Sequence, residues 1–143
     1  MEKTRSVGVI VYADFPEKRK FLLIQHATGH WAFPKGHIEK DENDLQAATR
    51  ELWEETGVTD IVLKTQKAVI HEEYEFSRNG HMICKEVDYF VAKANNTMVK
   101  VDGNEVKNFM WAGIKKAKSI ITYQQTIGLL LQAEDIIHEL LVN

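Results

Sequence analysis

Short blocks of apolar residues alternate with polar stretches along this chain, and most of these blocks predict β-strands. They are rich in β-branched and aromatic residues, and turn-forming residues separate them. The blocks cover residues 6–12, 21–26, 60–70, 71–76, 82–93 and 107–111, the fourth either continuing the third strand or beginning the next. Asn79-Gly80 precedes the fifth block and favours a tight hairpin turn into it.

Residues 43–57 instead show the spacing of an amphipathic helix. Asn43 and Gln46 have the capping-box pattern at its start, and Gly57 suits the left-handed conformation just past its last turn. Its apolar face consists of Leu45, Ala48 and Leu52. Because that face turns toward a core, the acidic residues on the other side are expected to face a cleft or water.

The last segment, residues 119–142, predicts a second helix. Thr122 and Gln125 have the spacing of a capping box. An apolar stripe at helical spacing consists of Ile127, Leu130, Leu131, Ile137 and Leu141. Strands combined with two such helices predict an α/β fold, a sandwich with a mixed sheet between helices. The length suits one domain, residues 1–143.

The composition is that of an ordinary globular protein, with 44% hydrophobic and 27% charged residues. A net charge of −3 argues against a stable nucleic-acid partner, since surfaces that bind nucleic acids are usually basic. Cys84 is the only cysteine, so no internal disulfide is possible. No apolar run is long enough to span a membrane and no signal peptide is recognisable, so a cytoplasmic location without a membrane partner is expected. The composition does not predict an oligomeric state.

Three carboxylates share one face of the first predicted helix. Glu51, Glu54 and Glu55 stand at positions i, i+3 and i+4, so they repel one another unless a cation lies between them. Clustered carboxylate oxygens suit Mg²⁺ or Mn²⁺ rather than a soft metal. The alternative interpretation is a helix face that is simply solvated.

A wider pattern surrounds these carboxylates. Gly36 is followed after five residues by Glu42, and after seven more by Arg50-Glu51-Leu52-Trp53-Glu54-Glu55-Thr56-Gly57-Val58. The nine defined positions of the Nudix box are all matched, so the chain resembles the Nudix hydrolase family. The resemblance implies an α/β sandwich, hydrolysis of a nucleoside polyphosphate, and Mg²⁺ or Mn²⁺ as the cofactor.

The same resemblance implies roles for individual residues. The metal ligands would be the Gly36 carbonyl, Glu51, Glu54, Glu55 and Glu105. Arg50 would orient Glu51. The general base would be either Glu51 or Glu105, so the catalytic set is Arg50, Glu51 and Glu105.

Two segments outside the box, residues 31–37 (W-A-F-P-K-G-H) and 85–92 (K-E-V-D-Y-F-V-A), also form patterns. They resemble the W-x-x-P-K-G-H and K-x-V-x-Y-(W/F)-x-A segments of one group within the family, the asymmetric dinucleoside tetraphosphate hydrolases. Tyr74, Glu105 and Tyr123 are similar to a tyrosine, an acidic loop residue and a base-stacking aromatic of that group. This resemblance implies cleavage of diadenosine tetraphosphate to ATP and AMP.

The residues expected to bind a small nucleotide substrate are Lys35, His37, Lys85, Tyr74, Tyr89 and Tyr123. The two lysines would bind the phosphate chain, and Tyr74, Tyr89 or Tyr123 would stack on adenine. The remaining histidines show no metal-ligand spacing and are interpreted as structural or surface residues: His26, His30, His71, His81 and His138.

Two other functions remain open. The F-P-K-G segment also occurs in Nudix enzymes that trim RNA 5′ ends, so the substrate could instead be a triphosphate-ended RNA or an oxidised nucleoside triphosphate. The other is a non-catalytic nucleotide sensor on the same fold. The complete glutamate set argues against a sensor, because a sensor could lose Glu51 or Glu54 freely.

Overall fold

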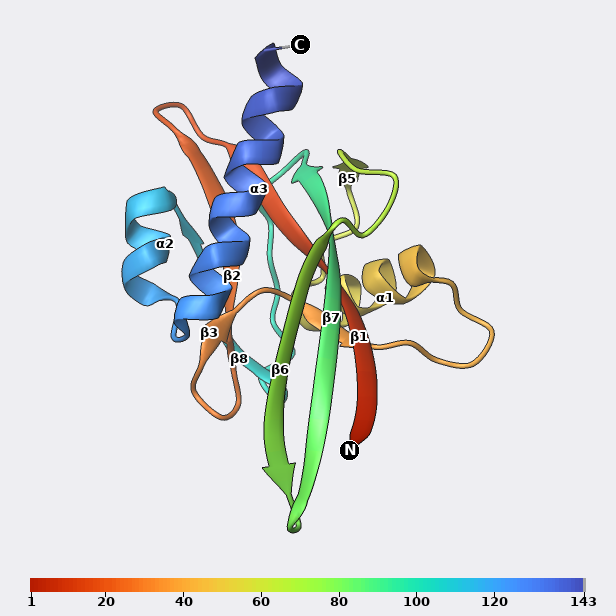
Figure 1. Cartoon of the computed structure of the whole chain (residues 1–143). Helices are drawn as coiled ribbons and strands as arrows, with labels where there is room; N and C mark the ends of the chain where they lie inside the picture. The colour runs from red at the N-terminus through yellow and green to blue at the C-terminus, as the bar shows by residue number, and fades with distance from the viewer. Residues whose placement is uncertain (143) are drawn as a thin grey trace.

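A computed structural model describes residues 1–142 of this chain and shows strands in one mixed sheet with helices on both faces (Figure 1). The elements are β1 (Glu2–Asp14), β2 (Arg19–His26), β3 (Trp31–Ala32), β4 (Lys35–His37), α1 (Asp44–Thr56), β5 (Ile61–Leu63), β6 (Ile70–Arg78), β7 (His81–Ala94), β8 (Val106–Ala112), α2 (Ile114–Ile120) and α3 (Gln124–Val142). The predicted α/β fold is confirmed. No helix within residues 1–142 is long and apolar enough to cross a membrane.

The sheet is organised around the long parallel pair of β1 and β7. β2 and β4 pair with β1 in antiparallel fashion, and β8 adds to the outer side of β2. β6 and β7 form an antiparallel hairpin that extends beyond the rest of the sheet (Figure 1). Asn79 and Gly80 connect these two strands with φ angles of 52° and 78°, which a tight type I′ turn requires, so the predicted hairpin is confirmed.

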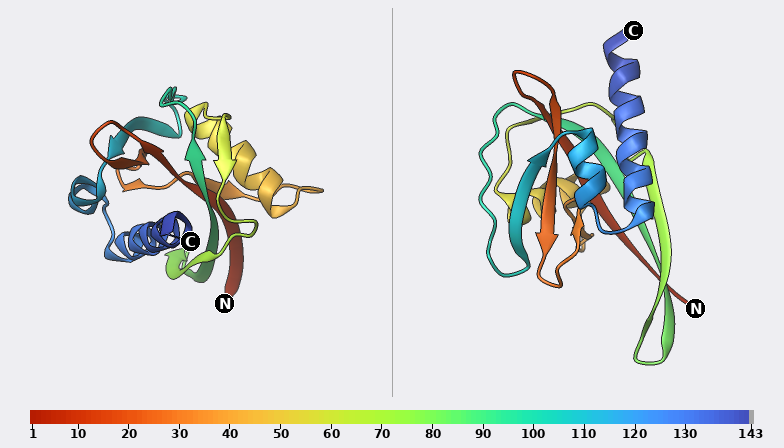
Figure 2. Two further views of the ribbon diagram at one scale, coloured as in Figure 1. Left: turned by 90° about the horizontal axis from the view of Figure 1, so that it is seen from above. Right: turned by 90° about the vertical axis from the view of Figure 1, so that its left-hand side faces the viewer.

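Helices cover the two faces of the sheet separately. Figure 2 shows α1 on one side of the β1–β7 pair and α3 on the other. Under α1, the core includes Val7, Val9, Val11, Ala47, Ala48 and Leu52. Under α3, the core includes Ile10, Phe21, Val87, Leu129, Leu130, Ala133 and Ile137. The sheet is therefore buried on both faces, which explains the continuous apolar runs of its central strands.

The caps predicted for α1 are confirmed in detail. The Gln46 backbone N–H donates to the Asn43 side chain at 2.8 Å, and the Asn43 N–H donates to the Gln46 side chain at 2.9 Å. Gly57 ends the helix in the left-handed region, with a φ of 72°. These caps are local, so the sequence specifies both ends of the helix that carries the acidic face.

The prediction for the C-terminal helix was wrong in three respects. The structure contains a separate short helix, α2, before α3 begins at Gln124. Thr122 and Gln125 do not cap α3, since Thr122 accepts a hydrogen bond from the Trp31 N–H at 2.8 Å and Gln125 donates to the Glu73 carbonyl at 2.7 Å. Of the predicted apolar stripe, Leu131 and Leu141 are exposed. Tertiary contacts thus decide where α3 starts and which side it buries.

The strand predicted at residues 60–70 was also wrong. Only Ile61–Leu63 form a strand, β5, and residues 64–69 lead as a loop to β6, which begins at Ile70. β5 pairs with the end of β7, while β6 pairs with β7 from its other side. The chain must therefore leave the sheet between the two strands. The apolar residues of the loop are compatible with a strand, so the sequence pattern does not predict this interruption.

Candidate active site

The Gly36 backbone lies directly against the side chain of Glu51. β4 holds Gly36 opposite Val7 of β1, and α1 packs on the same side of the sheet. A Cβ atom at position 36 would overlap the Glu51 carboxylate, so no other residue fits here without moving it. The strand and the helix thus bring together two of the residues predicted to bind metal.

Arg50 connects the acidic helix face to the loop before it. Its Nε donates to Glu42 at 2.7 Å and its Nη2 donates to the His37 carbonyl at 2.9 Å. Its Nη1 donates to Glu51 at 2.9 Å and to Glu54 at 3.2 Å. These hydrogen bonds raise the pKa of Arg50 above its ordinary value, with Glu42 as the largest cause. The guanidinium therefore fixes the orientation of Glu51 through Oε1 and, among residues 1–142, makes no hydrogen bond with the other Glu51 oxygen, Oε2.

Glu55 is the most buried carboxylate of the group, with 5% of its surface exposed. Burial raises its pKa to about 8, and the negative charges of Glu51 and Glu105 add to the effect. The Lys35 backbone N–H donates to one Glu55 oxygen at 3.0 Å. Burial also raises the pKa of Glu51, helped by the charges of Glu54 and Glu105. Clustered carboxylates of this kind fit a hard divalent cation with oxygen ligands.

Glu105 reaches this cluster from a distant part of the sequence. It lies in the exposed loop before β8, and its charge acts on both Glu51 and Glu55. Asp102 shapes the loop by accepting hydrogen bonds from the Asn104 and Val106 N–H groups, both at 3.0 Å. The Glu105 carbonyl accepts from the Ala27 N–H at 2.9 Å, which anchors the loop to the β2–β3 turn. All five predicted metal ligands therefore lie in one region.

A cavity of about 360 Å³ opens on the other side of β4, near the start of α3. Aromatic and polar side chains line it together: His30, Ala32, Lys35, Glu72, Tyr74, Phe76, Tyr89, Tyr123, Gln125 and Thr126. Lys35 joins this cavity to the carboxylate cluster, because Glu72, Glu55 and Glu51 all act on its charge. Four of the six predicted substrate-binding residues line the cavity.

The other two predicted substrate-binding residues lie beside it. Lys85 pairs with Tyr74 across the hairpin, and burial, with Lys35 and Arg78 nearby, lowers the pKa of Lys85 to about 8. His37 is exposed, and partial burial together with the charges of Lys85 and Lys35 lowers its pKa. Lys35 and Lys85 therefore form a positive group next to the carboxylates, with the imidazole of His37 beside them, an arrangement suited to a phosphate chain.

Of the three tyrosines expected to stack on adenine, Tyr89 is the least accessible. Tyr89 is 1% exposed and packs against Phe33 with ring centroids 6.1 Å apart, so it offers a base less ring surface than Tyr74 or Tyr123. Its hydroxyl donates to Glu72 at 3.4 Å. Tyr123 is 57% exposed and Tyr74 is half-buried, and both line the cavity, so these two rings retain open surface for a base.

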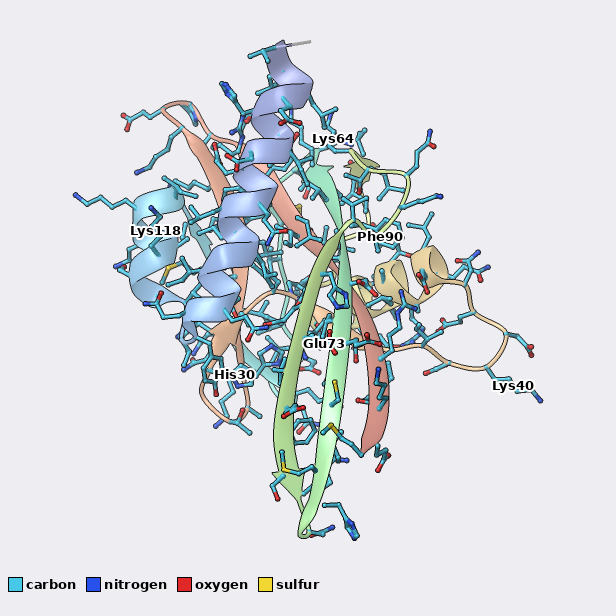
Figure 3. All side chains as sticks on the ribbon, in the orientation of Figure 1. His30, Lys40, Lys64, Glu73, Phe90 and Lys118 are labelled. Carbon is cyan, nitrogen blue, oxygen red and sulfur yellow. The ribbon has the colours of Figure 1, made fainter. Side chains whose placement is uncertain are left out.

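Sequence reasoning missed six of the ten residues that line the cavity, His30 and Glu72 among them. His30 was interpreted as structural or superficial, but it lies beside the start of α3 and lines the cavity (Figure 3), stacked on His26 with ring centroids 4.3 Å apart. Glu72 was not singled out, although it is 7% exposed and lines the same cavity. The alternation of side chains along a strand was the available signal, because it places Glu72 on the same side as Tyr74.

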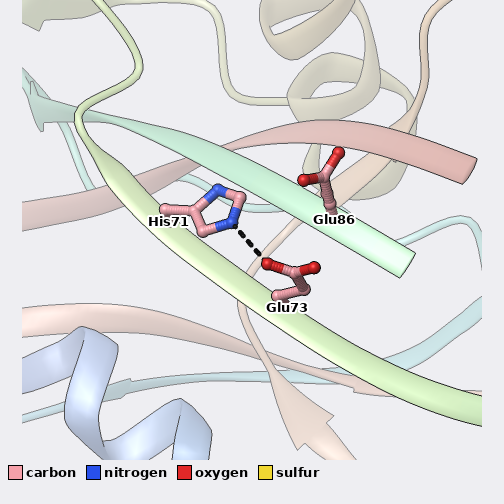
Figure 4. A group of neighbouring side chains, drawn as sticks. All are labelled: His71, Glu73 and Glu86. Atoms are coloured by element: carbon pink, nitrogen blue, oxygen red, sulfur yellow. Dashed lines mark hydrogen bonds and ion pairs between the residues drawn. The ribbon is translucent and has the colours of Figure 1, made fainter. Parts of the chain in front are cut away.

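A second acidic group lies on the opposite face of the hairpin, formed by His71, Glu73 and Glu86 (Figure 4). Their ligand atoms lie within 4.8 Å of one another. His71 Nδ1 lies 2.6 Å from Asp88, and Asp88 accepts from the Arg5 guanidinium at 2.9 Å. His71 and Glu73 are exposed and lie 3.4 Å apart, Glu86 is half-buried, and none of the three belongs to the predicted metal centre.

Comparisons with known proteins agree with this geometry. The family model described as NUDIX domain matches residues 2–131. The asymmetrical bis(5′-nucleosyl)-tetraphosphatase of Caenorhabditis elegans is 32% identical over 128 residues, covering 88% of this chain and 91% of that protein. The enzyme of the same name from Mus musculus is 31% identical over 109 residues, covering 74% of this chain and 72% of that protein.

Solved structures show the same fold. A binary complex of C. elegans Ap4A hydrolase superposes with a TM-score of 0.80 and 28% identity, covering 95% of this chain and 98% of that one. The NUDIX domain of Shewanella oneidensis NrtR in complex with ADP-ribose superposes with a TM-score of 0.74 and 17% identity, covering 96% and 90%. The second likeness concerns the fold alone.

Proposed function

Because this chain belongs to the Nudix family and is a Nudix hydrolase, we propose that it cleaves diadenosine tetraphosphate to ATP and AMP with Mg²⁺ or Mn²⁺. One observation carries the proposal. A carboxylate cluster around Gly36 lies beside a positive group and a cavity lined by tyrosines. Lys35 belongs to the positive group and also lines the cavity. The names of the relatives from C. elegans and mouse support the choice of substrate.

The metal would be held by the Gly36 carbonyl, Glu51, Glu54, Glu55 and Glu105. When bound, it would neutralise phosphate oxygens and lower the pKa of an attacking water. Arg50 keeps the Glu51 carboxylate in place through its contact at 2.9 Å. Glu51 or Glu105 accepts the proton of the water, because both carboxylates are more exposed than Glu55.

The substrate would lie across β4, with its phosphate chain near Lys35, His37 and Lys85. Each charge-assisted contact of this kind contributes about 1.5–3 kcal/mol. One adenine would enter the cavity between Tyr74 and Tyr123, whose rings have open surface.

The proposal extends to the setting of the enzyme. We place it in the cytoplasm, where the single Cys84 stays reduced, and treat residues 1–143 as one domain. Its partner is a small nucleotide, with no membrane and no stable nucleic-acid partner.

The test is a substrate panel with Lys85→Met. Removing this charge is expected to lower kcat/KM for diadenosine tetraphosphate by about 10- to 100-fold, because one phosphate contact is lost. ATP, which is shorter, is expected to lose less. Lys93→Met is the matched control, since Lys93 lies on the same strand, β7, but pairs with Asp14 at 3.0 Å near its far end.

The products decide between substrates. Formation of ATP and AMP from the dinucleotide supports the proposal. Equal activity on ATP, or a clear preference for triphosphate-ended RNA or an oxidised nucleoside triphosphate, assigns the enzyme to another branch of the family. Binding of nucleotides without turnover at saturating Mg²⁺ and Mn²⁺ identifies a sensor instead.

A further inference from the structure

Glu72 is a buried acid in the cavity that takes no part in the proposed chemistry. It lies on β6 two residues before Tyr74, so both side chains are on the side of the sheet that α3 covers. Only 7% of its surface is exposed. Glu72 therefore belongs to the buried part of the cavity lining, together with Tyr89 and Thr126, whereas Tyr123 is 57% exposed and belongs to its open part.

The surroundings of Glu72 leave hydrogen-bonding capacity unused. Among residues 1–142, its hydrogen-bond partner is the Tyr89 hydroxyl, which donates to Oε2 over a long 3.4 Å. Lys35 supports the negative charge from the side, while burial acts against it. A carboxyl group has two oxygens and room for several donors, and a buried one is stabilised when they are paired. A ligand with an N–H group at this depth would supply the missing donor.

The shape of a nucleotide determines which of its groups arrives there. The phosphates must stay near Lys35 and the carboxylate cluster, so the base enters the cavity with the edge farthest from the sugar leading. In adenine that edge carries the 6-amino group and N1. Tyr74 and Tyr123 line the route, and the two hydroxyls are close enough for Tyr123 to help raise the pKa of Tyr74. The 6-amino group is thus the first donor to meet the buried part of the cavity lining.

We propose that Glu72 accepts a hydrogen bond from the 6-amino group of adenine and thereby selects the base that this enzyme takes. The inference rests on the proposed function only in placing a base in the cavity. It assigns a specificity role to a residue that contacts neither the phosphates nor the metal ligands. Ionised or protonated, the carboxyl group keeps one oxygen that accepts, so the amino group is recognised in either state.

A different role for Glu72 would be to position Lys35, whose charge it stabilises. The two roles have different signatures. A residue that positions Lys35 affects all nucleotides alike, because they share the phosphate. If Glu72 hydrogen-bonds the base, replacing it changes the ratio of affinities between nucleotides that differ only at carbon 6 of the purine.

The experiment is calorimetric titration with four monophosphates: AMP, IMP, GMP and purine riboside 5′-monophosphate, which has hydrogen in place of the amino group. Wild type is expected to bind AMP at least about 10-fold more tightly than purine riboside monophosphate, as one hydrogen bond to a charged group predicts. Glu72→Leu is expected to bind both equally. Glu75→Leu is the matched control, because Glu75 is exposed on the opposite face of β6 and should keep the wild-type ratio.

Glu72→Gln provides a second measurement that does not depend on whether the leucine variant folds. Its amide can donate as well as accept, so it is expected to bind IMP, with its 6-carbonyl, about as tightly as AMP. A merely structural role would leave this ratio where wild type has it. Circular dichroism checks that each variant is folded.

Several results would overturn the inference. One is an unchanged ratio in Glu72→Leu or Glu72→Gln, with all ligands weakened alike. Another is tighter binding of GMP than AMP that disappears in Glu72→Leu, since this would mean that guanine is read. Product analysis on diadenosine tetraphosphate separates the two proposals. Absence of hydrolysis with a Glu72-dependent preference for AMP refutes only the proposed function, whereas hydrolysis without that preference refutes only the inference.

Discussion

This protein contains two groups of acidic side chains, and they differ in what surrounds them. The box cluster, Glu51, Glu54 and Glu55 on α1, lies between the helix, the Gly36 backbone and the Glu105 loop. The ladder group, His71, Glu73 and Glu86, lies on the open face of the β6–β7 hairpin (Figure 4).

The surroundings shift the pKa of the glutamates in opposite directions in the two groups. In the box cluster, burial and like charges raise the pKa of Glu51 and bring that of Glu55 to about 8, although Arg50 is nearby. In the ladder group, contacts with Cys84 and His71 lower the pKa of Glu73, and Asp88 raises the pKa of His71. Glu73 and His71 of the ladder group are thus paired with neighbouring side chains. The box cluster is left with charge that a divalent cation would offset, so acidic spacing alone does not identify a metal site.

The largest expected difference is in catalysis. Glu54→Gln removes a charged ligand from the box cluster and is expected to lower kcat for diadenosine tetraphosphate by at least about 100-fold. Glu86→Gln makes the same chemical change in the ladder group and should stay within about twofold of wild type. Steady-state rates at saturating Mg²⁺, with circular dichroism for the fold, make the measurement. Near-normal turnover of folded Glu54→Gln would remove that residue from the metal site.

The next difference concerns stability against pH in metal-free protein. The pKa of Glu55 rises from 4.5 to about 8 on folding, so the folded protein holds a proton that the unfolded chain releases first. The stability from this group is complete below pH 4.5 and is lost as pH rises toward 8. One pKa unit corresponds to about 1.4 kcal/mol, so the loss relative to Glu55→Gln is on the order of a few kcal/mol. Denaturant unfolding in EDTA across this range measures it, and parallel curves for the two proteins would contradict the burial of that charge.

Metal binding should distinguish the groups by a somewhat smaller amount. Mg²⁺ at 100 times its Kd is expected to stabilise wild type by about 2.7 kcal/mol, which raises Tm by roughly 5–10 °C. Glu55→Gln should blunt this rise, whereas Glu86→Gln should keep it. Thermal melts with Mg²⁺ and Mn²⁺ make the comparison. A rise lost in Glu86→Gln instead would move the metal to the hairpin.

The smallest effect is expected in the ladder group itself. Glu73 and Glu86 stand directly opposite each other across the two strands, and like charges in that position repel. Removing the Glu86 charge should therefore change the free energy of unfolding by no more than about 0.5 kcal/mol, toward greater stability. Urea denaturation of metal-free protein tests this. A clear destabilisation would show that Glu86 makes a contact that the hairpin depends on.

Local patterns predicted the parts of this protein whose interactions are local. Asn43, Gln46 and Gly57 specify the ends of α1, and Asn79-Gly80 specifies the hairpin turn, since each acts on backbone within a few residues. The grouping of Glu51, Glu54 and Glu55 follows from helical spacing in the same way. The start of α3 and the length of β5 were mispredicted because contacts from Trp31, Glu73 and β7 determine them, and these lie far away in sequence.

For the site, the sequence by itself determined the acidic helix face and the glycine that Glu51 packs against. The tertiary structure alone decided that Tyr89 is buried while Tyr123 is open, and that His30 and Glu72 line one cavity. It also decided that Glu105 reaches the box cluster whereas Glu73 faces away from the cavity. The physical reason is that spacing along a helix or strand sets which side chains share a face. Burial, and with it pKa and access for a ligand, depends on what the rest of the chain places over that face.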